Sequence, residues 1–190
     1  MNEGTSYTFF CLYSNNLVYY LVAANHLHMI TLTTFTAADF DQFITWIDSN
    51  ELLITIAGSY FSYPLTKEQL QKYLLDEKSY SFNITDTDAN IVIGHAELIN
   101  MGNDLYKIDK LIIGDKNQRG KGTGEKVMQL LVKYAFEKLN ASTVELNVFD
   151  WNTSAIRCYE KTGFVINPAK SATYKAGDKE WLALNMMINK

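Results

Sequence analysis

The sequence predicts an α/β fold of the α+β kind: a mixed, twisted sheet of six to seven strands flanked by about four helices. Three patterns carry this prediction. Residues 108–113 are apolar and β-branched enough for a buried strand, and they lead through a glycine-rich turn into an amphipathic helix. Residues 143–149 form a second apolar run after a gap that suits a crossover helix. Residues 80–84 and 90–99 flank an Asp-Thr-Asp-Ala-Asn turn, which indicates a hairpin.

The order of the elements follows from apolar spacing and helix caps. A first strand is expected from Ile30, and Thr36 caps a helix whose apolar face includes Phe40. Thr66 and Gln69 have the spacing of a capping box for the next helix. The other elements are expected as strands at 80–84, 90–99, 105–113, 143–149, 164–166 and 181–188, a helix after the glycine-rich turn, and a short helix within 152–163. Residues 168–180 are expected to form a polar link beside a binding pocket.

Composition limits the classes of function. The 190 residues suit one domain, and 47% hydrophobic with 20% charged residues is typical of a globular protein. A net charge of −4 argues against general nucleic-acid binding, which needs basic surfaces. Two cysteines, Cys11 and Cys158, imply no disulfide framework and favour a reducing cytoplasm. The apolar run at residues 17–24 is too short to cross a bilayer, so we expect no membrane partner.

Residues 1–28 differ from the rest of the chain. They contain no Lys or Arg, so they lack the positive start of a secretory signal. We interpret them as an extension outside the catalytic fold or as an over-long reading frame, with the domain proper at residues 29–190. Their aromatic residues favour packing on the domain or on a second subunit, which leaves a homodimer open.

The glycine-rich turn at residues 118–124 has the chemistry of a phosphate-binding loop. A helix that starts there exposes free backbone N–H groups, and the glycines let a phosphate approach them closely. The spacing matches neither a P-loop nor a dinucleotide fingerprint, which disfavours a nucleotide-binding protein. It does match R-x-x-G-x-G, read from Arg119 through Gly122 to Gly124.

A second motif, N-x-x-A-x-x-x-Y-x-K-x-G-F, is complete over residues 152–164. Together the two motifs resemble the GNAT superfamily of N-acetyltransferases, whose R-x-x-G-x-G loop binds the pyrophosphate of acetyl-CoA. The resemblance covers residues 30–187 and is strongest at 108–164. The lead-in from Ile113 to Lys116 looks most like the RimJ/RimL-type branch.

The resemblance implies roles for particular residues. Acetyl-CoA would be the cosubstrate, and no metal would take part. The backbone of Ile112 and Ile113 would pair with its pantetheine arm. The Asn152 side chain would also contact that arm. Tyr159 would be the general acid that protonates the departing thiolate. The residues implied in cofactor binding are Ile112, Ile113, Arg119, Gly120, Lys121, Gly122, Thr123, Gly124 and Asn152.

The general base is left open by the resemblance. Some GNAT enzymes have a Glu where this chain has Asn147, and an amide cannot take a proton. Glu97 is therefore our first candidate, and His95 lies on the same strand face by alternation. Asp109, Glu145 and a water relay are the alternatives. Cys158 as an acetylated nucleophile is disfavoured, because direct transfer needs no covalent step.

The predicted function is transfer of an acetyl group from acetyl-CoA to a primary amine by direct attack. The acidic balance favours a cationic acceptor such as a polyamine, an aminoglycoside-like amine or a peptide N-terminus. In GNAT-like folds the segment that corresponds to residues 46–63 lines the acceptor pocket. The alternative is a catalytically silent domain that binds acyl-CoA as a sensor or scaffold.

Overall fold

The structure, a computed structural model, describes residues 29–176 and 179–190. The predicted N-terminal extension, residues 1–28, therefore lies outside the described residues. One mixed sheet runs through the molecule in the order β1-β2-β3-β4-β5-β8-β6, with β7 also paired to β8. Among the described strands, only β4 and β5 pair in parallel; the other neighbours are antiparallel. In the described part of the chain, no helix has the length and apolar character needed to cross a membrane.

The strands are β1 Ile30–Thr34, β2 Ser79–Asp86, β3 Ile91–Gly102, β4 Leu105–Ile113, β5 Thr143–Phe149, β6 Val165–Ile166, β7 Ala172–Ala176 and β8 Lys179–Asn189. The α-helices are α1 Phe40–Trp46, α2 Asn50–Ala57, α3 Lys67–Tyr73, α4 Thr123–Lys138 and α5 Thr153–Lys161. The described residues also contain three short 3-10 helices, η1 Ala37–Asp39, η2 Lys116–Gln118 and η3 Pro168–Lys170.

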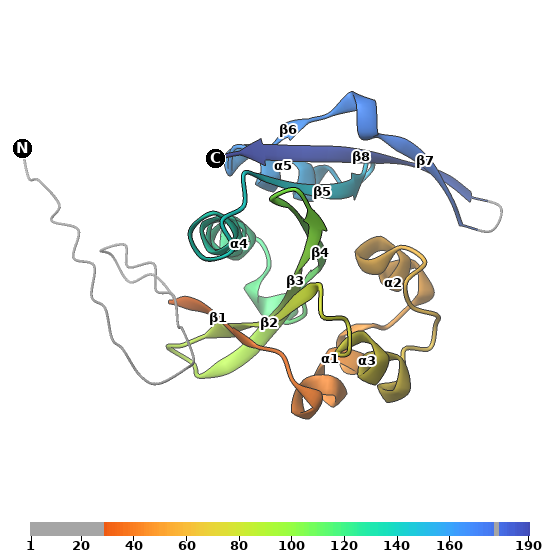
Figure 1. Ribbon diagram of the computed structural model, residues 1–190. Helices are drawn as coiled ribbons and strands as arrows, with labels where there is room; N and C mark the ends of the chain where they lie inside the picture. The colour runs from red at the N-terminus through yellow and green to blue at the C-terminus, as the bar shows by residue number, and fades with distance from the viewer. Residues whose placement is uncertain (1–28, 177–178) are drawn as a thin grey trace, which may run out of the picture.

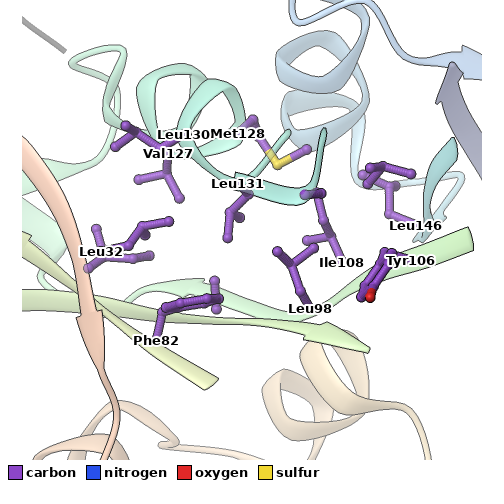
Figure 2. Packing of buried hydrophobic residues seen from close by; sticks show 14 of the residues in the cluster. Leu32, Phe82, Leu98, Tyr106, Ile108, Val127, Met128, Leu130, Leu131 and Leu146 are labelled. Carbon is purple, nitrogen blue, oxygen red and sulfur yellow. The ribbon is translucent and has the colours of Figure 1, made fainter. Parts of the chain in front are cut away.

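Helix α4 covers one face of the sheet and helices α1 to α3 cover the other (Figure 1). Among the described residues, a hydrophobic core lies on each of these faces. On one face, Val127 and Leu131 of α4 pack against sheet residues such as Phe82, Leu98 and Ile108 (Figure 2). On the other face, helices α1 to α3 enclose a smaller core. Its members include Phe43, Leu53, Leu70, Tyr73 and Ile112, all buried. The sheet thus holds α4 on one side and a three-helix cover on the other.

A bulge in β4 creates the opening in the sheet. His95 pairs with Ile112, and Glu97 pairs with Asp109. The interval from 95 to 97 on β3 therefore lies opposite the longer interval from 109 to 112 on β4. Lys110, inside the bulge, has a φ of +48°, in the left-handed region. Beyond the bulge β4 leaves its other neighbour: the β4–β5 pairing ends at residue 108, although β4 runs to residue 113 and β5 to residue 149. The ends of the two strands therefore lie apart.

The predicted fold class is confirmed, with two differences in the element list. The sheet has eight strands among the described residues, because β7 lies where we expected a polar link. An edge strand like β7 pairs through its backbone and stays exposed, so its polar sequence carries no alternation signal. Helix α2 lies within residues 46–63, where we expected no helix. Its run of isoleucines resembles a strand, but Ser49 caps it by accepting from the Leu52 N–H.

The expected capping box of α3 forms only in part. Thr66 accepts from the Gln69 N–H, as predicted. The Gln69 side chain does not reach back to the cap; it accepts from the Ser62 N–H at 2.8 Å and donates to the carbonyls of Ser62 and Pro64. Gln69 thus fixes the loop that follows α2.

Candidate active site

The first cavity, of about 530 Å³, opens where β4 separates from β5, and we call it the glycine-loop cavity. The end of β4, the turn before α4, one side of α2 and the start of α5 form its walls. Its lining residues are Leu52, Thr55, Ile56, Leu111, Ile112, Ile113, Gln118, Arg119, Gly120, Gly122, Thr123, Gly124, Glu125, Asn152, Ser154, Ala155, Arg157, Cys158, Tyr159 and Lys161. Both sequence motifs therefore meet in one place.

The glycine-rich turn presents backbone to this cavity. Gly120 and Gly122 have φ values of +74° and +77°, which L side chains rarely adopt. Nothing lies within 4 Å of the position that a Cβ would take at either glycine. Gly122 is the N-cap of the 16-residue helix α4, and no side chain caps it. The first amides and the positive end of the helix dipole are thus open to an anion, which fits a pyrophosphate.

Arg119 is anchored at the end of β4. Its Nε donates to the Ile113 carbonyl at 2.9 Å, so its guanidinium lies beside the open helix end. A side chain at Gly94 of β3 would overlap the Ile112 carbonyl, which shows that this carbonyl points toward β3. Because successive carbonyls of a strand point to opposite edges, the Leu111 and Ile113 carbonyls face the cavity. Leu111 is a cavity residue that the sequence analysis missed.

Helix α5 supplies the opposite wall. Asn152 caps it, with Oδ1 accepting from the Ala155 N–H at 3.3 Å, which leaves the amide Nδ2 to donate elsewhere. Tyr159 lies further along the same helix, lines the glycine-loop cavity and packs against Phe164. Burial raises the pKa of the Tyr159 phenol well above its usual value, so it keeps its proton. Gly163, with φ +94°, directly follows the C-cap of the helix, Thr162.

A second cavity, of about 350 Å³, adjoins the first, and we call it the Asp109 cavity. Thr55 and Ile56 of α2 line both cavities, so the two meet there. Of the segment 46–63, which the resemblance places at an acceptor pocket, residues 54–60 line this cavity. That an acceptor binds here stays a prediction. The lining residues are Ile54, Thr55, Ile56, Ala57, Gly58, Ser59, Tyr60, Lys107, Asp109, Asn147, Val148, Phe149, Tyr174 and Ala183.

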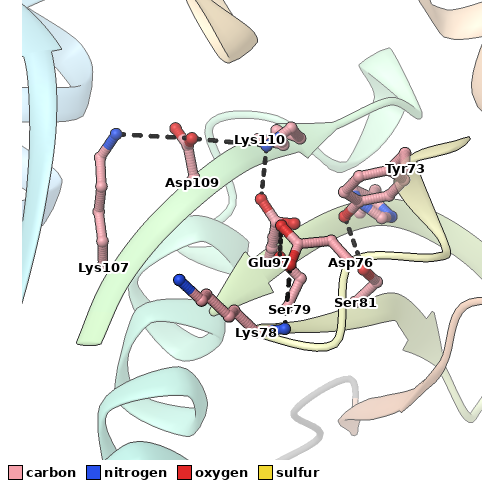
Figure 3. A network of polar contacts seen from close by, with 10 residues as sticks. Tyr73, Asp76, Lys78, Ser79, Ser81, Glu97, Lys107, Asp109 and Lys110 are labelled. Carbon is pink, nitrogen blue, oxygen red and sulfur yellow. Dashed lines mark hydrogen bonds and ion pairs between the residues drawn. The ribbon is translucent and has the colours of Figure 1, made fainter. Parts of the chain in front are cut away.

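A network of ion contacts lies beside this cavity and connects Lys107, Asp109, Lys110 and Glu97 (Figure 3). Lys110 and Glu97 form an ion pair at 2.6 Å, and both side chains are only 1% exposed. The Lys110 ammonium also lies 4.0 Å from the ring centre of Tyr60. Asp109 Oδ2 is 3.5 Å from the ammonium groups of both Lys107 and Lys110. The bulge thus directs Lys110 inward, next to Asp109, which lines the cavity.

Most of the predicted site residues come together, but Lys121 and Glu97 do not. Lys121 is exposed in the turn and lines neither cavity. Glu97 lies behind Lys110 and also lines neither cavity. Burial raises the pKa of Glu97, and the nearby Lys110 opposes that shift. Its role as a general base stays a prediction.

The alternatives for the base are placed in different surroundings. His95 is fully buried, its Nε2 is 3.1 Å from the Tyr73 hydroxyl, and burial lowers its pKa to about 3. Glu145 pairs with Lys170 at 2.7 Å. Asp109 is the one of these candidates that lines a cavity. Burial raises the pKa of the Cys158 thiol, which disfavours a thiolate there. Within residues 29–176 and 179–190, His, Cys, Asp and Glu side chains form no cluster that could hold a metal.

Known proteins share parts of this sequence and its fold. The family model described as "Acetyltransferase (GNAT) domain" matches residues 29–165. A probable spermine N(1)-acetyltransferase of Bacillus subtilis subsp. natto is 35% identical over 60 residues, which cover 32% of this chain and 39% of that protein. The spermidine N(1)-acetyltransferase of Vibrio cholerae is 29% identical over 106 residues, 56% of this chain and 61% of that one. The matched segments thus span less than two thirds of either relative.

Solved structures share the fold. A crystal structure of spermidine N-acetyltransferase from Vibrio cholerae in complex with CoA and spermine superposes with a TM-score of 0.72. The match has 20% sequence identity and covers 84% of this chain and 95% of that one. A dodecameric structure of the same enzyme matches with a TM-score of 0.66 at 20% identity, over 84% and 93% of the two chains. At these identities the likeness shows the architecture of the chain.

Proposed function

Because the chain belongs to the GNAT family of acetyltransferases, we propose that it transfers an acetyl group from acetyl-CoA to a primary amine. One observation carries the proposal: the uncapped start of α4 and the residues of the second motif line a single cavity. That cavity adjoins a second one at Thr55 and Ile56, so a donor and an acceptor can approach each other from two sides.

The donor is assigned to the glycine-loop cavity. The amides that open α4, together with Arg119, would bind the diphosphate of CoA. The backbone of Leu111 and Ile113 and the Asn152 amide would bind the pantetheine arm; for Ile112, the backbone role stays a prediction. Acetyl-CoA supplies the thioester whose acyl group is transferred.

Tyr159 is the proposed general acid. Because burial raises its pKa, the phenol keeps its proton at neutral pH and is available to donate it as the thiolate departs. The raised pKa also makes it a weaker acid than an ordinary tyrosine, so its role depends on its position beside the thioester. Its place on the wall of the glycine-loop cavity supports this role. The test of Glu97 as the base is the pH–rate profile of Glu97→Gln, which must change if Glu97 takes the proton.

The acceptor is proposed to be a polyamine or a similar cationic amine. The relatives named for spermine and spermidine support this class, as does the net charge of −4. A peptide N-terminus remains the second candidate, because the RimJ/RimL-like branch stays a prediction. Cytoplasmic location and a homo-oligomer are proposed as well; the dodecamer of the Vibrio cholerae enzyme makes the oligomer worth measuring.

The experiment has two parts. Calorimetry with CoA measures binding, and incubation with acetyl-CoA and a panel of spermine, spermidine, an aminoglycoside and a peptide measures thiol release. Binding with turnover of at least one amine is expected. Tight CoA binding without turnover across the panel would favour the sensor or scaffold function, and absence of CoA binding would refute both.

A further inference from the structure

The Asp109 cavity contains one carboxylate among the described residues that line it, Asp109 itself. The only other charged residue of its lining is Lys107. The side chain of Asp109 is 24% exposed, whereas Glu97 is 1% exposed and closed off behind Lys110. An amine that enters this cavity therefore meets Asp109 and not Glu97.

The bulge in β4 explains how Asp109 comes to face the cavity. In a regular strand, neighbouring side chains point to opposite faces, but here Asp109 and Lys110 lie close enough for an ion contact. Lys110 turns inward to Glu97 and is covered by the Tyr60 ring. The buried Lys110–Glu97 pair stabilises the bulge, and the bulge determines that the Asp109 side chain faces the cavity.

The two oxygens of Asp109 are not equivalent. Both ion contacts, from Lys107 and from Lys110, end on Oδ2 at 3.5 Å. Oδ1 makes neither contact, and we assign the amine to this oxygen. Other charged or titratable groups near Asp109 are Glu97, whose charge balances Lys110, and Tyr60, whose pKa is raised by burial so that it stays neutral. Across the β4–β5 pairing, Glu145 faces Lys107 and is bound by Lys170.

We propose that Asp109 binds the acceptor amine and that the buried Lys110–Glu97 pair is its positioning device; this inference rests on the proposed acetyl transfer. Asp109 replaces Glu97 as the carboxylate that touches the substrate. The four charges of Lys107, Asp109, Lys110 and Glu97 sum to zero. Net charge alone therefore does not attract a polycation into the cavity. The amine is selected instead by one hydrogen bond that it donates to Oδ1 of Asp109.

The first test is Asp109→Asn, with spermidine as acceptor and acetyl-CoA as donor. We expect kcat/KM for spermidine to fall by about tenfold or more, the loss that follows removal of a hydrogen bond to a charged group, while the KM for acetyl-CoA is unchanged. Asp104→Asn is the matched control. Asp104 is exposed in the β3–β4 turn, lines neither cavity and has a φ of +57°, which Asn tolerates.

If the parent protein turns over no amine, calorimetry of spermidine with the CoA-bound protein takes the place of kinetics. Spermidine binding that Asp109→Asn abolishes would support the inference while the proposed function fails. Equal spermidine kinetics or equal binding for the parent and Asp109→Asn, or no spermidine binding at all, would overturn it.

The second test concerns positioning. The double variant Glu97→Gln/Lys110→Met removes both buried charges, and we expect it to raise the KM for spermidine about tenfold with the KM for acetyl-CoA unchanged. Lys107→Met, at a partly exposed side chain, leaves an excess negative charge in the cavity. It is expected to lower the KM for spermidine about threefold, as for loss of a partly exposed ion pair. A double variant with the spermidine KM of the parent, or a Lys107→Met that raises it, would overturn the positioning account.

Discussion

The glycine-loop cavity and the Asp109 cavity share Thr55 and Ile56, but they are built from different atoms. The first depends on backbone: an uncapped helix start, two glycines with positive φ and the end of a strand. Its parts come mainly from two continuous stretches of sequence. The second depends on side chains from α2, β4, β5, β7 and β8, which only the folded chain brings together. A motif can therefore specify the first cavity, but only the fold can specify the second.

The largest expected effect separates chemistry from binding in the glycine-loop cavity. Tyr159→Phe removes the proton that we assign to the departing thiolate. We expect kcat to fall by about 10² to 10⁴, the range for general acid catalysis, with CoA affinity unchanged in calorimetry. Tyr63→Phe is the control, because Tyr63 lines neither cavity. A Tyr159→Phe variant with full kcat would remove Tyr159 from the mechanism.

The next effect concerns the buried ion pair of Lys110 and Glu97 next to the Asp109 cavity. Lys110→Met leaves Glu97 buried without its partner, which is expected to cost about 3–5 kcal/mol in the free energy of unfolding, measured in urea. Lys67→Met breaks an ion pair of the same 2.6 Å length with Asp41, but in side chains 58% and 77% exposed. That loss should stay below about 1 kcal/mol. Similar losses for the two variants would mean that the buried pair does not hold the bulge.

Lys110 also shows where sequence reasoning reached its limit. The sequence predicts one buried strand over residues 108–113, and β4 contains these residues. The successive polar residues Asp109 and Lys110 break the alternation of β4, and this was the available signal of a bulge. The sequence could not show that Lys110 is buried. The residues that contact it, Glu97, Tyr60 and Tyr73, come from other parts of the chain.

The motif residues were predictable because their function lies in local backbone geometry. Gly120, Gly122 and Asn152 have the turn and cap conformations that their residue types favour, and Tyr159 follows on the same short helix. The strand β7 was missed for the opposite reason. Tyr174 joins the Asp109 cavity only because β7 pairs with β8, and its own sequence has no strand pattern.

We expect acid to destabilise the fold through His95. This residue lies in the core under helices α1 to α3, where it packs against Phe35 and Phe43. Burial lowers its pKa from 6.5 to about 3 in the folded chain, so between these values the unfolded chain binds the extra proton. Stability should therefore fall as the pH falls from 6.5 toward 3. The contribution of His95 to this slope is at most about 1.4 kcal/mol per pH unit.

The measurement is the difference between urea unfolding curves of the parent and His95→Gln across that range. His95→Gln should have the shallower dependence on pH. Tyr73→Phe removes the hydroxyl near His95 Nε2 without removing the imidazole, so it should keep the slope of the parent. A slope that is the same in the parent and in His95→Gln would show that His95 does not drive acid unfolding.

Two glycines with similar positive φ values allow the roles of the backbone in stability and in binding to be compared. Gly122→Ala places a Cβ at a φ of +77°, and Gly102→Ala does so at +83° in the β3–β4 turn, with nothing within 4 Å in either case. Each should lose about 1–2 kcal/mol of stability from the left-handed conformation alone. Only Gly122→Ala also adds a methyl group where a phosphate would approach the helix start.

CoA affinity then distinguishes the two variants. Gly122→Ala should weaken CoA binding in calorimetry by about tenfold, equivalent to about 1.4 kcal/mol, while Gly102→Ala should bind CoA as the parent does. Because the two glycines share their strain and their open surroundings, a difference in affinity can come only from contact with the ligand. Equal affinities would mean that CoA does not approach the start of α4, and the backbone-made cavity would then have to serve another ligand.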